Sequence, residues 1–152
     1  MSSLPGKMFT FPKESDIDHV RLLTKSENYS SVTICLSFAL HIGKYHGCSL
    51  FSMATPTSTN DFLLFKESNG AMQLPVRYVG SAFTGLPGKQ NMWMGHSATG
   101  LSQVWINGKP SARKLGYTAG SVVNGKPIII LGQEQDAYCG TFKKREGITF
   151  LK

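Results

Sequence analysis

Glycine and proline recur along the whole chain and divide it into short apolar segments. The 152 residues include 16 glycines and 7 prolines, and both residue types interrupt regular structure and favour turns. No long window carries the apolar spacing of an amphipathic helix. Short, regularly spaced strands with turn residues between them are typical of a sandwich or barrel. With 41% hydrophobic residues, the sequence predicts one globular all-β domain over residues 1–152.

The clearest strand covers residues 32–40. Its apolar side chains recur at the even positions, and Cys35 falls on the other face. This alternation predicts a strand with one buried and one exposed face. Two more strands are predicted at 49–53 and 61–66, separated by a polar loop at 55–60.

The dipeptide Asn107-Gly108 predicts a β-hairpin, because both residues tolerate a positive φ. Pro110 follows and confines the returning strand to a sheet edge, since proline donates no backbone hydrogen bond. Asn124-Gly125 predicts a second turn, which leads into an apolar run.

That run, Ile128–Leu131, predicts a buried strand, and Gly132 ends it. The next four residues, 133–136, are Gln-Glu-Gln-Asp. Carboxylate, amide and backbone oxygens in a loop are the ligands that Ca²⁺ prefers. The same residues are also compatible with a solvated acidic turn.

The segment Gly132–Asp136 (GQEQD) resembles the calcium loop of the pentraxins. Four other motifs agree with the family in order and spacing: FTFPKES at 9–15, FSMAT at 51–55, WINGKP at 105–110 and GYT at 116–118. The resemblance runs from Lys7 to Phe142. It implies an antiparallel two-sheet jelly-roll sandwich of lectin type, which would lack the C-terminal part of the family's fold.

The resemblance also implies a set of calcium ligands. In this sequence they are Asn60, Glu134, Gln135, Asp136 and, at a downstream amide position, Glu146. Thr59 stands where the family has an aspartate, and Lys143 stands where it has an acid. Calcium affinity follows the negative charge of the ligands, so the expected site is weakened, and the alternative is inherited loop residues that bind no metal.

As a pentraxin, the chain would be a secreted, calcium-dependent pattern-recognition lectin of innate immunity that forms a homopentamer. Its ligands would be phosphocholine, carbohydrate or anionic groups, with Phe65 as the apolar wall of the pocket. Two alternatives stay open. The net charge of +7, with the cluster Lys143–Arg145, suits a calcium-independent binder of polyanions such as nucleic acid. A degenerate homologue without function is the other.

Three cysteines cannot all pair with one another. Cys35 matches the first half of the family's disulfide, and the second half falls at Met92 or Trp93. Neither residue is a cysteine, so we predict that this disulfide is absent. Cys48 and Cys139 have no counterpart in the resemblance.

No enzyme motif occurs in the sequence, and His19 and His96 are interpreted as surface residues without partners. No apolar run is long enough to span a membrane. No signal peptide is visible, so secretion follows from the resemblance alone. The sequon at Asn28 predicts a glycosylation site if the chain is secreted.

Overall fold

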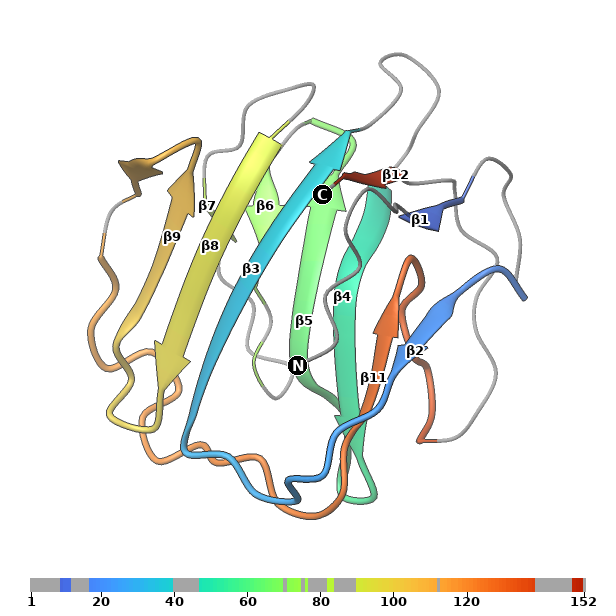
Figure 1. The fold of residues 1–152 in the computed structure, drawn as a ribbon. Coiled ribbons are helices and arrows are strands. Elements are labelled where there is room, and N and C mark those ends of the chain that lie inside the picture. The colour runs from blue at the N-terminus through green and yellow to red at the C-terminus, as the bar shows by residue number, and fades with distance from the viewer. Residues whose placement is uncertain are drawn as a thin grey trace.

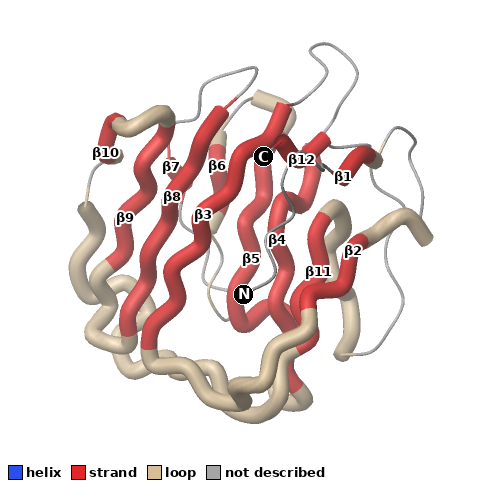
Figure 2. The backbone as a smooth tube through the Cα atoms, in the orientation of Figure 1, coloured by secondary structure: helices blue, strands red, loops and turns tan. Residues whose placement is uncertain are grey.

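The computed structural model describes residues 9–11, 17–39, 47–69, 71–74, 76, 82–83, 90–111, 113–138 and 149–151. All regular structure in these residues is β-strand, arranged in two six-stranded antiparallel sheets that face each other (Figures 1 and 2). The predicted all-β, two-sheet jelly-roll sandwich is therefore confirmed.

The first sheet has the order β1–β12–β3–β8–β9–β10. Its strands are β1 (Phe9–Thr10), β12 (Thr149–Leu151), β3 (Ser31–Ala39), β8 (Gln90–Ser97), β9 (Ser102–Ile106) and β10 (Lys109–Pro110). The second sheet has the order β2–β11–β4–β5–β6–β7. Its strands are β2 (Val20–Leu22), β11 (Ile128–Leu131), β4 (Gly47–Thr55), β5 (Ser58–Glu67), β6 (Met72–Gln73) and β7 (Ala82–Phe83).

The core lies between the sheets and is built by alternate residues of their strands. In β3, Ile34 and Phe38 are buried and Cys35 is exposed, as the alternation predicts. The same period places Met92 and Met94 of β8 inside. Burial of these apolar faces is the main force that holds the two sheets together.

The β4–β5 hairpin differs from the sequence prediction. We expected a polar loop over residues 55–60, but β4 runs to Thr55 and β5 begins at Ser58. Asn60 therefore lies inside a strand. The prediction was wrong because polar side chains, which favour loops in a sequence, are tolerated here at half-buried positions of β5.

The two predicted turns are present. Asn107 and Gly108 have φ angles of 50° and 80° and join β9 to β10. Pro110 lies in β10, the last strand of its sheet, as predicted. At the second turn, Gly125 has a φ of 87° and precedes β11.

Candidate functional site

Strand β11 ends in a sharp reversal at Gly132. This glycine has a φ of 88°, and a Cβ there would lie 2.9 Å from the Phe11 ring. No other residue fits both the positive φ and the close ring. The chain therefore turns back over its own sheet along residues 132–138, which we call the return segment.

Two residues fix the path of the return segment. The backbone N–H of Gln135 donates to Ser52 Oγ (3.2 Å), and its side-chain Nε2 donates to Ser52 O (3.1 Å) and to Ile128 O (3.0 Å). The Tyr138 hydroxyl donates to Lys126 O (3.0 Å). Because Ile128 is the first residue of β11 and Lys126 precedes the strand, the return segment runs back along β11 toward its beginning.

The residues of the return segment alternate between buried and open positions. Gln133 and Gln135 are each 1% exposed, whereas Glu134 is half-buried and Asp136 is exposed. The Gln135 amide therefore anchors the segment, and the two carboxylates are more open to solvent than the two amides. Carboxylates at spaced positions on a fixed backbone suit a calcium ion.

Asn60 lies in an irregular part of the β4–β5 ladder. Thr59, Asn60 and Asp61 together face one residue of β4, Ala54. Ala54 pairs on its other side with Ile128, whose carbonyl holds Gln135. Neighbouring strands are about 4.8 Å apart, so the backbone of this bulge lies roughly two strand spacings, about 10 Å, from Ile128.

The side-chain Oδ1 of Asn60 is buried and has no hydrogen-bond partner in the part of the chain that the structure describes. A buried carbonyl oxygen in that state is costly, and a bound cation would satisfy it. That oxygen is therefore available as one ligand of a calcium ion. Asp61, beside it, is 1% exposed and accepts a hydrogen bond from Thr55 Oγ1, which gives that carboxylate a structural role.

The other predicted site residues are only partly placed. Phe65 lies half-buried in β5 with its ring against Gly47, where an added Cβ would be 3.0 Å away. Glu146, Lys143 and the cluster Lys143–Arg145 lie outside the described residues. Within the described ranges, no group of three or more His, Cys, Asp or Glu side chains could hold a metal ion.

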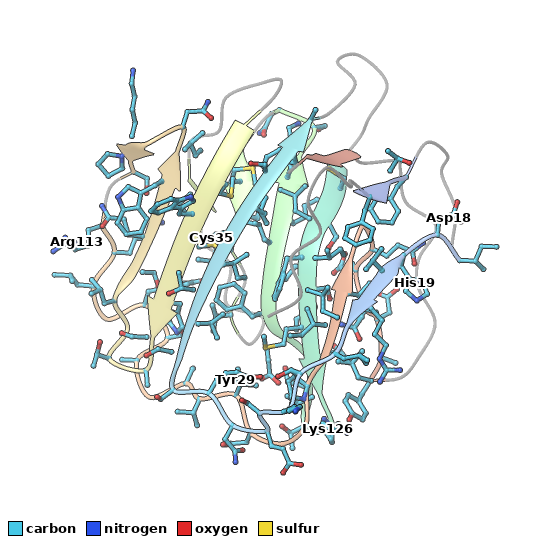
Figure 3. The ribbon with its side chains drawn as sticks, in the orientation of Figure 1. Asp18, His19, Tyr29, Cys35, Arg113 and Lys126 are labelled. Carbon is cyan, nitrogen blue, oxygen red and sulfur yellow. The ribbon has the colours of Figure 1, made fainter. Side chains whose placement is uncertain are left out.

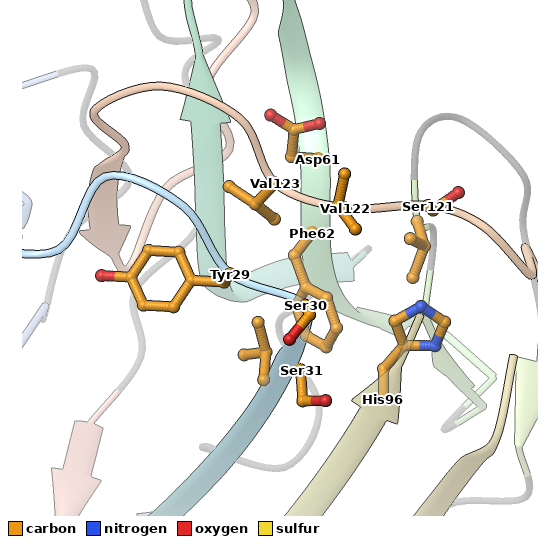
Figure 4. Close-up of a pocket in the computed structure, with 11 residues that line it drawn as sticks. Tyr29, Ser30, Ser31, Asp61, Phe62, His96, Ser121, Val122 and Val123 are labelled. Atoms are coloured by element: carbon orange, nitrogen blue, oxygen red, sulfur yellow. The ribbon is translucent and has the colours of Figure 1, made fainter. Parts of the chain in front are cut away.

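A second polar cluster was missed in the sequence. We interpreted His96 as a surface residue, but it is only 7% exposed and lines a small pocket (Figure 4). Its Nδ1 hydrogen-bonds Ser102 Oγ at 2.6 Å. Thr118 lies 3.4 Å from the other ring nitrogen, and the Tyr117 ring packs edge-on. Burial lowers the pKa of His96. The adjoining cavity of about 10 Å³ has room for a single water and none for a substrate.

Cys35 is a free, exposed thiol on the outer face of β3 (Figure 3). Its register partner on β8 is Trp93, which is the second of the two positions expected for the missing cysteine. Cys48 is buried in β4, and Cys139 lies outside the described residues. Asn28 is exposed, as a glycosylation acceptor must be, and its Oδ1 accepts a bond from the Gly125 N–H.

Comparison with known proteins now decides the family. A model of the Pentaxin family matches residues 7–149. The chain belongs to the pentraxin family. This pentraxin is 36% identical to serum amyloid P-component of Bos taurus, over 95% of this chain and 66% of the relative. It is 37% identical to C-reactive protein of Mus musculus, over 93% of this chain and 65% of the relative.

A solved structure shares the fold. The native heptameric SAP-like pentraxin of Limulus polyphemus superposes with a TM-score of 0.77 at 21% identity, covering 94% of this pentraxin and 72% of that chain. The present chain spans about two thirds of the length of the relatives it matches. Among the described residues, no helix is long and apolar enough to cross a membrane.

Sequence reasoning named Glu134 and Asp136 as candidate ligands and missed the group that anchors the segment between them. Ser52, fully buried in β4, accepts three hydrogen bonds from Gln135. In the sequence, Ser52 interrupts the apolar run from Leu50 to Ala54, and this polar residue was the feature that could have indicated a buried hydrogen bond. Its role depends on a contact 83 residues away in the chain, which no local pattern contains.

Proposed function

We propose that this pentraxin is a calcium-dependent, lectin-like binding protein rather than an enzyme. The observation that supports it is the buried Oδ1 of Asn60, which has no hydrogen-bond partner among the described residues. Asn60 lies in the bulge opposite Ala54. Ala54 pairs with Ile128, and the Ile128 carbonyl accepts a hydrogen bond from Gln135. A cation held between these two places would satisfy that oxygen.

Asn60, Glu134, Gln135 and Asp136 would hold the calcium ion, joined by Glu146 from outside the described residues. When bound, the ion supplies an open coordination position for an anionic oxygen of a phosphate or sugar. Gln135 fixes the backbone that carries the two carboxylates. Phe65, on the same strand β5 as Asn60, would offer an apolar wall to a choline group, and phosphocholine is the first ligand to test.

Secretion and ring assembly are part of the proposal. The relatives include a serum protein, and the solved structure from Limulus is heptameric. We propose a secreted ring of identical subunits, with five as the number expected from the resemblance. Light scattering of the purified protein measures the number of subunits. A monomer would contradict ring assembly but would not bear on the proposal of calcium binding.

Thermal unfolding tests the calcium site directly. The protein is heated with millimolar Ca²⁺ and then with EDTA, because a ligand that binds only the folded state raises the melting temperature. We expect a calcium-dependent rise that disappears in Asn60→Ala. The control is Asn69→Ala, which removes the same amide from an exposed turn and should keep the calcium response.

A cooperative transition that ignores calcium would contradict the metal site. Binding of heparin or single-stranded DNA that weakens steeply with salt and ignores EDTA would then favour the polyanion binder. The absence of any cooperative transition would favour a degenerate homologue. If calcium raises the melting temperature, phosphocholine is titrated against the wild type and against Phe65→Ala. The comparison of the two affinities tests whether phosphocholine is the ligand.

A further inference from the structure

The sequon at Asn28 lies in a loop whose backbone is held by its own side chains. Of the six asparagines in this sequence, only Asn28 has a serine or threonine two residues later, at Ser30. The Tyr29 hydroxyl closes the loop, because it hydrogen-bonds Thr24 Oγ1 and donates to Ser26 O (3.3 Å). The sequon is therefore presented from a defined backbone.

The residues around the sequon are open to solvent. An N-linked glycan is bulky and solubilising, so it is found on protein surfaces. Residues 25–28 and Ser30 are all exposed. Tyr29, between the two sequon positions, is half-buried and forms a β-bridge with Val123. The acceptor is thus at the surface, while its neighbour ties the loop to the sandwich.

The two polar atoms of the Asn28 amide have different surroundings. Its Oδ1 accepts a hydrogen bond from the backbone N–H of Gly125 (3.0 Å), which lies 97 residues away in the chain. Its Nδ2 has no hydrogen-bond partner among the described residues. Because N-glycosylation joins the sugar to the nitrogen, the modification and the contact with Gly125 use different atoms.

We propose that Asn28 carries an N-linked glycan on Nδ2 while its Oδ1 continues to hold the Asn124–Gly125 turn. In the transfer, Nδ2 bonds to the anomeric carbon of an oligosaccharide, and the bond from that carbon to a lipid pyrophosphate breaks. The nitrogen loses one proton, and the lipid pyrophosphate leaves. The product is still an amide, and its Oδ1 accepts the same hydrogen bond. Glycosylation rests on the proposed secretion, because N-linked acceptors belong to secreted chains.

The attachment point lies where three loops meet. A Cβ on Gly125 would be 3.4 Å from Cδ of Pro56, in the turn between β4 and β5. The next residue, Lys126, holds the end of the return segment through its carbonyl. Figure 3 shows Tyr29 and Lys126 at this end of the sandwich. A glycan on Asn28 therefore covers the end at which these loops meet.

Expression of the intact protein in cultured animal cells tests the glycan. Medium and cell lysate are collected separately and treated with peptide N-glycosidase. We expect protein in the medium whose gel mobility increases on digestion. The enzyme converts a glycosylated asparagine to aspartate, so digestion in water labelled with heavy oxygen should place the label at residue 28 in the peptide mass spectrum.

Four substitutions separate the glycan from the contact with Gly125. Ser30→Ala removes the sequon, leaves the Asn28 side chain unchanged and should abolish the glycan, whereas Ser30→Thr should keep it. Asn28→Asp loses the acceptor nitrogen but keeps an oxygen for the Gly125 N–H, and Asn28→Ala loses both. Among these unglycosylated variants, Asn28→Ala should therefore unfold at a lower urea concentration than Asn28→Asp or Ser30→Ala.

Protein in the medium without a glycan at residue 28 would overturn the proposal and leave secretion standing. Unglycosylated protein found only in the lysate would contradict both secretion and the glycan. A glycan that persists in Ser30→Ala would overturn the assignment to Asn28. Equal urea midpoints for Asn28→Ala and Ser30→Ala would overturn the role given to Oδ1.

Discussion

Cys35 and Trp93 lie opposite each other in the β3–β8 ladder. Trp93 in turn faces Trp105 on β9, and Trp105 faces Pro110 on β10. Cys35, Trp93, Trp105 and Pro110 therefore form a row across the outer face of the first sheet. Trp93 in this row is 62% exposed. The residue that replaces the expected second cysteine stands within reach of Cys35 itself.

Restoring that cysteine should restore the cross-link. Cα atoms of directly opposite residues are about 4.5–5.5 Å apart, within the range that a disulfide bridges. Trp93→Cys should form a disulfide with Cys35 under oxidising conditions and raise the free energy of unfolding by roughly 2–4 kcal/mol. Thiol titration and urea denaturation, with and without reductant, measure both effects.

Trp105→Cys serves as the matched control. It removes the same ring from the same face, but residue 105 pairs with Trp93 and lies two strands from Cys35. No disulfide should form within one molecule. If Trp93→Cys keeps two free thiols at these positions after oxidation, the register of β3 on β8 is wrong.

Thr59→Asp should strengthen calcium binding. It adds a carboxylate next to Asn60 in the bulge of β5, and calcium affinity rises with the charge of the ligands. We expect a gain of about tenfold by calorimetric titration with Ca²⁺. Thr57→Asp adds the same charge in the exposed turn, and an equal gain there would mean that the effect is general electrostatic attraction.

Gln135→Ala should destabilise the protein and weaken calcium binding together. The side chain is 1% exposed and donates to the carbonyls of Ser52 and Ile128. Leaving these buried groups without a donor costs about 1–3 kcal/mol. Gln103→Ala is the control, because Gln103 is half-buried and makes one hydrogen bond, to Ser111 O (3.0 Å). Urea denaturation should show a smaller decrease in the free energy of unfolding for this variant than for Gln135→Ala.

Stability should fall in mild acid because of His96. Burial lowers its pKa below the usual value of 6.5, so the unfolded chain takes up a proton before the folded chain does. The free energy of unfolding therefore decreases as the pH falls through 6.5 and stops decreasing below the folded-state pKa. Urea denaturation from about pH 8 to about pH 5 measures this slope.

His96→Gln removes the titrating ring and should flatten the slope. The variant is compared with the wild type over the same range, so a uniform loss of stability does not obscure the result. An unchanged slope in His96→Gln would assign the acid sensitivity to other groups.

The sequence by itself determined the all-β fold class and the turns, and it marked Glu134, Gln135 and Asp136 as an oxygen-rich segment. Asn60 and Glu146 became candidate calcium ligands only through the resemblance to the family. The fold class, the turns and the oxygen-rich segment follow from local rules: alternation in residues 32–40, positive φ at Asn107-Gly108, and polar residues directly after a buried strand. Each signal lies within a few residues, so no knowledge of distant contacts was needed.

Only the tertiary structure decided which groups meet. The anchor of Gln135 on Ser52, the pairing of Cys35 with Trp93 and the burial of His96 against Ser102 each depend on register. A shift of one residue would turn every side chain of a strand to the other face. Register is set by the packing of both sheets together, and no single stretch of sequence carries that information.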